Sequence, residues 1–260
     1  MPAMGGRKLH YLVMKDQPDR LKMGRDAFFN LLSRNGLLLR RRKNKTRTTF
    51  ASEKGRKYSN LIDGNPPSQA GMLLVSDITY IPYKNDFLYL SLITDGYSRE
   101  ILGWSLSKSL DTNGPLNALR VALKKQPPLA GCIHHSDRGC QYCSHRYVNK
   151  LKMNNIQISM TQRGDPRENA IAERVNGILK TEWINKLTFS SFENAEKLIK
   201  KIIHLYNTKR PHYSLGMKTP LQASIEKGDL KPLWKSYYKC SSPGERLSGK
   251  GGGYRPTSGL

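Results

Sequence analysis

The chain of 260 residues is long enough for one domain with a substantial core and a smaller module. Lys and Arg number 44 against 20 Asp and Glu, a formal net charge of +24, which is typical of proteins that bind a polyanion such as nucleic acid. No stretch approaches the roughly 18 consecutive apolar residues of a membrane-spanning helix, and residues 1–6 lack the apolar core of a secretory signal. These features, and four cysteines that are too few for a disulfide framework, exclude membrane and secreted classes, so we expect a cytoplasmic protein.

Residues 1–50 predict a small, basic, helical module. Apolar residues recur at helical spacing over about 7–15 and 24–34, and Asn35-Gly36 is a favourable helix end. Two such helices are expected to pack in a helix-turn-helix-like arrangement, with a basic run directly after them. That run is interpreted as a DNA contact, although a solvated tail is the alternative. Its first residues are Arg40, Arg41, Arg42 and Lys43.

Three further regions follow from composition. Residues 51–71 are polar, contain Pro66-Pro67, and are interpreted as a linker. Residues 72–230 carry the periodic segments of a folded core. Residues 231–260 are basic, lose all periodicity and are rich in Gly, Ser and Pro, so we expect a disordered tail.

The core shows strand and helix patterns in the order βββαβαβα, followed by one more amphipathic helix. Strands are expected over residues 73–81, 87–94, 100–106, 131–134 and 156–160, and helices over 112–125, 144–153, 169–187 and 192–206. This order predicts an α/β architecture, a mixed sheet with helices on both faces.

Three carboxylates stand out by their place in that order. Asp77 lies inside the first strand among apolar residues, where an unpartnered carboxylate would be costly to bury. Asp137 follows the fourth strand, at the carboxyl end where open α/β sheets place their sites. Glu173 lies in the first turns of a long helix. Three acids that meet at one sheet edge would favour hard cations such as Mg²⁺, and two ions there would serve phosphoryl transfer.

Five short motifs, taken in their order along the chain, resemble the motifs of one protein family. The segments are 76–81 (SDITYI), 95–104 (DGYSREILGW), 135–142 (HSDRGCQY), 168–173 (ENAIAE) and 206–212 (YNTKRPH), the last of which contains Arg210 and His212. They are similar to the retroviral-type integrase core, specifically that of OrfB-type transposases of bacterial insertion sequences. Between Asp137 and Glu173 lie 35 residues, the spacing that the D,D-35-E name of the superfamily describes.

The resemblance implies a ribonuclease-H-like fold with a mixed five-stranded sheet, and a DNA transposase that cleaves element ends and joins a 3′-hydroxyl to target DNA. It implies Asp77, Asp137 and Glu173 as catalytic metal ligands for two Mg²⁺ ions, with Mn²⁺ as a substitute. Its expected partners are terminal-repeat and target DNA, further copies of the chain on DNA, and an OrfA partner or frameshift fusion, in the bacterial cytoplasm at the nucleoid. DNA contacts are expected from Lys180, Arg138 and Asn169, although Asn169 could instead cap the catalytic helix.

Three alternatives stay open. Cys140 and Cys143, with Cys132 and nearby histidines, allow a zinc interpretation, but a single CxxC without a second paired spacing is weak support for it. A non-catalytic DNA-binding relic of a transposase would share the composition, although the intact acidic triad argues against it. A nuclease of the same fold would share the acids and differ in using water as the attacking group.

Overall fold

The structure is a computed structural model that describes residues 3–16, 23–39, 58–62, 66–162 and 169–230. The basic run from Arg40 to Lys43, the tail and parts of the predicted linker therefore lie outside the described residues. Across the described ranges, no helix is long and apolar enough to cross a membrane. The division of the chain into domains stays a prediction.

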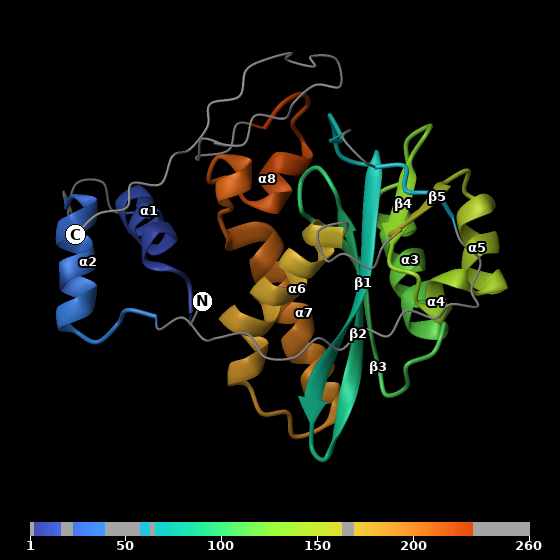
Figure 1. Cartoon of the computed structure of the whole chain (residues 1–260). Coiled ribbons are helices and arrows are strands. Elements are labelled where there is room, and N and C mark those ends of the chain that lie inside the picture. The colour runs from blue at the N-terminus through green and yellow to red at the C-terminus, as the bar shows by residue number, and fades with distance from the viewer. Residues whose placement is uncertain (1–2, 17–22, 40–57, 63–65, 163–168, 231–260) are drawn as a thin grey trace, which may run out of the picture.

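A mixed sheet of five strands in the order β3-β2-β1-β4-β5 organises the core (Figure 1). The strands are β1 (Leu73–Tyr83), β2 (Asp86–Asp95), β3 (Ile101–Ser107), β4 (Ile133–Ser136) and β5 (Gln157–Met160). The first three form an antiparallel meander, whereas β4 runs parallel to both β1 and β5. The predicted α/β class and the five-stranded mixed sheet are confirmed.

Helices cover both faces of this sheet (Figure 1). One face carries α3 (Asn113–Lys125), α4 (Cys140–Cys143) and α5 (His145–Lys152), which share a buried apolar cluster with the sheet. The other face carries α6 (Ala170–Glu182) and α7 (Phe192–Lys209) over a second cluster. Gly103 of β3 lies so close to α3 that a Cβ there would stand 2.0 Å from the Ala118 carbonyl oxygen, so a side chain is excluded.

The remaining elements lie on the α6–α7 side of the molecule (Figure 1). They are α1 (Gly6–Asp16), α2 (Arg25–Arg34), η2 (Ile184–Lys186), η3 (Tyr213–Leu215) and α8 (Pro220–Ser224). The two predicted amino-terminal helices are present and contact each other. A salt bridge of 3.8 Å joins Lys8 of α1 to Glu182 at the end of α6, so the amino-terminal helix touches the core.

One predicted helix boundary was wrong, and one short helix was missed. The helix predicted over 169–187 ends at Glu182, because the backbone of Trp183 leaves the helical region and the chain continues as η2. The short helix α4 was not predicted, since four residues are too few to show a 3.6-residue period.

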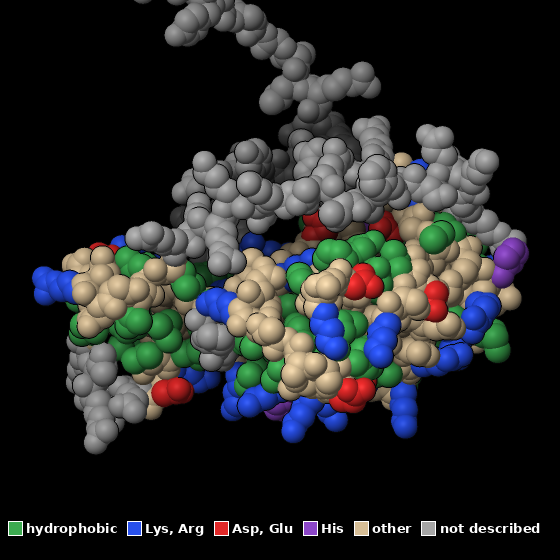
Figure 2. Space-filling model, turned by 90° about the horizontal axis from the view of Figure 1, so that it is seen from below, with side chains coloured by type: hydrophobic (Ala, Val, Ile, Leu, Met, Phe, Trp, Pro, Cys, Tyr) green, Lys and Arg blue, Asp and Glu red, His purple; other side chains and the backbone are tan. Residues whose placement is uncertain are grey.

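Lys and Arg side chains lie on the face of the molecule that Figure 2 shows. In this view from below, Lys and Arg side chains lie scattered among apolar and neutral ones instead of forming one patch. The excess charge is therefore not confined to the two ends of the chain.

Candidate active site

The register of the sheet brings Asp77 and Asp137 together. β1 and β4 are parallel neighbours, and Val75 lies opposite His135. Asp77 is two residues after Val75 and Asp137 is two residues after His135, so the two aspartates occupy matching positions. Neighbouring strands lie about 4.8 Å apart. The two carboxyl groups therefore stand side by side where β4 ends, and the charge of Asp137 raises the pKa of Asp77.

Asp77 is partly buried and held from two sides. Its Oδ2 accepts a hydrogen bond of 2.6 Å from Asn176 Nδ2 of α6, and its Oδ1 accepts one of 2.8 Å from the Ile78 backbone N–H. Burial, followed by the charge of Asp137, raises the pKa of Asp77 to about 7, although both hydrogen bonds oppose the shift. An ionised carboxylate at this position therefore lacks sufficient positive charge around it.

Asp137 immediately follows the last residue of β4. The Gly139 backbone N–H donates a 3.0 Å hydrogen bond to its Oδ1, and burial raises its pKa. A Cβ at residue 139 would lie 3.0 Å from that same oxygen, so glycine leaves the carboxylate room to approach the backbone.

Glu173 is an exposed residue in the first turn of α6. The hydrogen bond from Asn176, three residues later, orients this helix face toward Asp77, and the charge of Glu173 contributes to the raised pKa of Asp77. The three predicted acids thus come from β1, the end of β4 and α6 and meet at one region. As the side chains stand, no three His, Cys, Asp or Glu residues of the described ranges are grouped closely enough to hold a metal ion.

The residues predicted to contact DNA have different surroundings. Lys180 is partly buried on the same helix as Glu173; burial lowers its pKa, and the negative charge of Asp77 opposes that shift. Arg138 follows Asp137, and its Nη2 donates to Gln162 Oε1 at 3.1 Å. Asn169 is buried, and its Nδ2 donates to the Ser76 carbonyl at 3.0 Å.

Asn169 therefore connects the start of α6 to β1, the strand that carries Asp77. It occupies the N-cap position of α6 but makes no side-chain cap hydrogen bond, so the predicted capping interaction is wrong. Its bond to β1 fixes the helix that carries Glu173 relative to the strand that carries Asp77. A contact of Asn169 with DNA stays a prediction.

Three of the four cysteines belong to the described residues, and two of them lie at the two ends of α4. Cys132 is buried, and burial raises its pKa to about 12, whereas Cys140 is exposed. Cys143 lies with its Sγ 3.9 Å from the Arg138 carbonyl and 4.0 Å from Met160 Sδ. None of these contacts joins two cysteines.

Sequence reasoning missed the polar residues that hold the strands. His134 Nε2 lies 2.8 Å from Ser76 Oγ and 2.9 Å from Tyr147 OH, and burial lowers the pKa of His134 to about 3, so the ring is neutral. Asp95 is buried and accepts hydrogen bonds from the backbone of Gly71 and from Ser98. Asp95 and His134 therefore stabilise the framework beneath the acids.

Comparison with known families identifies two matching regions. The Integrase core domain matches residues 67–166, and a second model with the same description, Integrase core domain, matches residues 154–220. Together they span the sheet, the helices α3 to α7 and the segment that follows α7.

Curated relatives are insertion-sequence proteins. The transposase for insertion sequence element IS904 of Lactococcus lactis is 39% identical over 147 residues, which are 56% of this chain and 58% of the relative. The transposase for insertion sequence element IS629 of Shigella sonnei is 31% identical over 206 residues, which are 78% of this chain and 68% of the relative. The chain thus spans little more than half of the Lactococcus protein.

A solved structure shares the fold. A chain in the cryoEM structure of a simian T-cell lymphotropic virus intasome, in complex with a PP2A regulatory subunit, aligns with a TM-score of 0.54 at 17% identity. The alignment covers 90% of this chain and 77% of the other.

Proposed function

The chain belongs to the insertion-sequence transposases that carry an integrase core, and from this premise we propose that it is a metal-dependent DNA strand transferase. It cleaves the ends of its element and joins a 3′-hydroxyl to target DNA. The observation that carries this proposal is the meeting of Asp77, Asp137 and the Glu173 face of α6 at one end of the sheet.

The residues fit a divalent cation. The donors are all carboxylate oxygens, which Mg²⁺ prefers, and burial has raised the pKa of both aspartates, so positive charge would stabilise their ionised forms. Asn176 and the Gly139 backbone fix the orientation of the two carboxyl groups. Two ions, with Mn²⁺ as a substitute, would supply activation of the attacking oxygen and stabilisation of the leaving oxygen.

Basic residues near the acids would position the DNA. Lys180 lies close enough to Asp77 for their charges to interact, so its ammonium group can hold a phosphate next to the scissile bond. Arg138 follows Asp137 directly, which supports a contact with the backbone of the same DNA strand. We further propose that the enzyme acts as an oligomer on DNA at the nucleoid, with an OrfA partner or fusion.

The test is a strand-transfer assay with labelled duplexes from the element ends, in Mg²⁺, Mn²⁺ or EDTA. Joined products should require metal and should disappear in Asp137→Asn and Glu173→Gln. Matched controls are Asp86→Asn and Glu196→Gln, because both wild-type acids are exposed and lie outside the acidic site. Products that persist in EDTA or in Glu173→Gln would contradict the proposal, and cleaved products without joining would identify a nuclease.

A further inference from the structure

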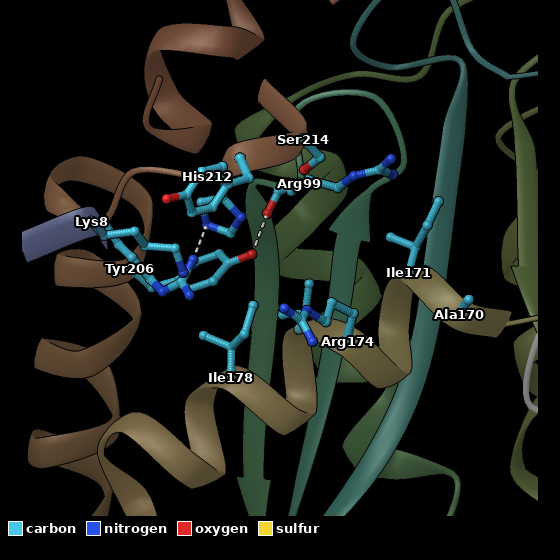
Figure 3. Close-up of a pocket in the computed structure, with 12 residues that line it drawn as sticks. Lys8, Arg99, Ala170, Ile171, Arg174, Ile178, Tyr206, His212 and Ser214 are labelled. Carbon is cyan, nitrogen blue, oxygen red and sulfur yellow. Dashed lines mark hydrogen bonds between the residues drawn. The ribbon is translucent and has the colours of Figure 1, made fainter. Parts of the chain in front are cut away.

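A second site lies on the other side of α6. A cavity of about 240 Å³ opens between α1, α6, α7 and the segment after α7 (Figure 3). None of Asp77, Asp137 and Glu173 lines it. Its polar and charged lining includes Lys8, Arg99, Arg174, Tyr206, Arg210 and His212.

The cavity has an excess of positive charge. Four of its lining residues are Lys or Arg; Glu182 contacts Lys8 and Arg210, and the charge of Asp95 acts on Arg99. Burial, followed by the charge of Arg210, lowers the pKa of Lys8 to about 8, although Glu182 opposes the shift. These two carboxylates therefore do not neutralise the four cations.

Arg210 already bonds to both Glu182 and His212. Arg210 is almost fully buried and donates to Glu182 through Nε at 2.7 Å and Nη2 at 2.6 Å. Its Nη1 lies 3.0 Å from His212 Nε2, which must accept because guanidinium only donates. Burial and the neighbouring cations lower the pKa of His212 to about 2, so this ring stays neutral. These residues form the wall of the site.

Two cationic side chains, Lys8 and Arg174, have N–H groups available to donate hydrogen bonds to a ligand. Neither the Lys8 ammonium nor the Arg174 guanidinium makes a hydrogen bond to any residue that the structure describes; Lys8 has its 3.8 Å salt bridge to Glu182. Figure 3 shows Lys8 entering from α1, and Arg174 on α6 between Ile171 and Ile178. By contrast, Arg99 already donates to the Gly96 carbonyl, and Tyr206 OH to the Arg99 carbonyl.

We propose that this cavity binds a tetrahedral oxyanion of the phosphate type. Lys8 and Arg174 donate hydrogen bonds to the anion, and the positive charge of Arg210 in the cavity wall stabilises it. The available donors, the excess positive charge and the open cavity of about 240 Å³ all match such a group. Because Lys8 belongs to α1 and Arg174 follows Glu173 on α6, the bound anion would connect the amino-terminal helix to the catalytic helix. The site goes beyond the strand-transfer activity and does not depend on a metal.

Binding is tested by calorimetric titration of the full chain with inorganic phosphate, at constant ionic strength set with chloride. Wild type should show saturable binding, and Arg174→Gln and Lys8→Gln should each weaken it about tenfold or more. Arg120→Gln is the matched control, because this exposed arginine of α3 bonds only to Asn117 among the residues described. Absence of saturable binding, or equal weakening by Arg120→Gln, would overturn the proposal.

A second titration identifies the source of the anion. Phosphate is added to the chain saturated with a short duplex of unrelated sequence, without metal. If the duplex blocks phosphate binding in wild type, and Arg174→Gln weakens the duplex itself, a DNA backbone phosphate fills the site. If phosphate still binds and still requires Arg174, the ligand is a free phosphate-type anion. Loss of strand transfer in Glu173→Gln leaves both titrations interpretable, because neither measures catalysis.

Discussion

The acidic site and the basic cavity lie on two faces of one helix, α6. The acidic site gathers carboxylates and the cavity gathers cations, and the two sites differ in how these charges are held. Glu173 and Arg174 are adjacent on α6, yet the first interacts with Asp77 while the second lines the cavity. Backbone N–H groups and an amide hold the aspartates, so their negative charge is oriented but not neutralised. In the cavity, one buried carboxylate, Glu182, holds two cations. The shorter of these two salt bridges, at 2.6 Å, is the Arg210–Glu182 pair, on which the structure of the basic cavity chiefly depends.

The largest expected effect comes from breaking that pair. Arg210→Leu leaves Glu182 buried without its bidentate partner, which should lower the free energy of unfolding by roughly 3–5 kcal/mol. Denaturant unfolding of the full chain measures this. The double variant Arg210→Leu/Glu182→Leu should recover a large part of the loss, because no uncompensated charge remains. If the single and double variants are equally unstable, lost packing and not the buried charge causes the effect.

A smaller effect is expected on the acidic side, where one amide positions Asp77. Asn176→Ala removes the 2.6 Å hydrogen bond to Asp77 Oδ2, and loss of such a supporting bond typically costs about 10–100-fold in metal affinity or activity. We expect strand transfer to need a correspondingly higher Mg²⁺ concentration for half-maximal rate. Asn149→Ala on the exposed face of α5 is the control. An unchanged Mg²⁺ dependence in Asn176→Ala would contradict a positioning role for this residue.

The two regions also differ in how well the sequence predicts them. The acids could be found because strand periodicity and chain order place Asp77 and Asp137 at one sheet edge. The register that sets them opposite each other, and the amide of Asn176, could not be derived, since both depend on side chains far apart in sequence. The sequence places Arg210 and His212 in the motif 206–212, but it does not indicate which residues they contact. The partner of Arg210, Glu182, lies on α6, 28 residues away in the sequence.

The cavity cannot be predicted from the sequence. Lys8 and Arg174 are two of 44 basic residues, and nothing local separates them from solvated ones. Only the packing of α1 against the end of α6 gives Lys8 a buried position. Strand and helix patterns predict a site at the carboxyl ends of strands well. A site between elements that are distant in the sequence can be found only from the tertiary structure.

The smallest expected effect is a proton taken up in the cavity. Groups facing Lys8 are Arg174 and Glu182 from α6 and Arg210 from the segment after α7; the neighbouring His212 stays neutral. Since the pKa of Lys8 is lowered to about 8, its ammonium is partly deprotonated at that pH, and a bound anion should raise the pKa again. Binding near pH 8 should therefore take up a fraction of a proton, and binding near pH 6 almost none.

Sulfate is the probe for this measurement, because it does not titrate in that range, whereas phosphate does. The heat of binding is measured in buffers of different ionisation enthalpy, and its slope gives the number of protons exchanged. Wild type should show uptake at pH 8 that Lys8→Met lacks, while Arg120→Gln retains it. The same uptake in Lys8→Met, or a net release of protons in wild type, would mean that Lys8 does not face the anion. In that case Arg174 and Arg210 would remain as its cationic partners, and the link from the anion to α1 would be lost.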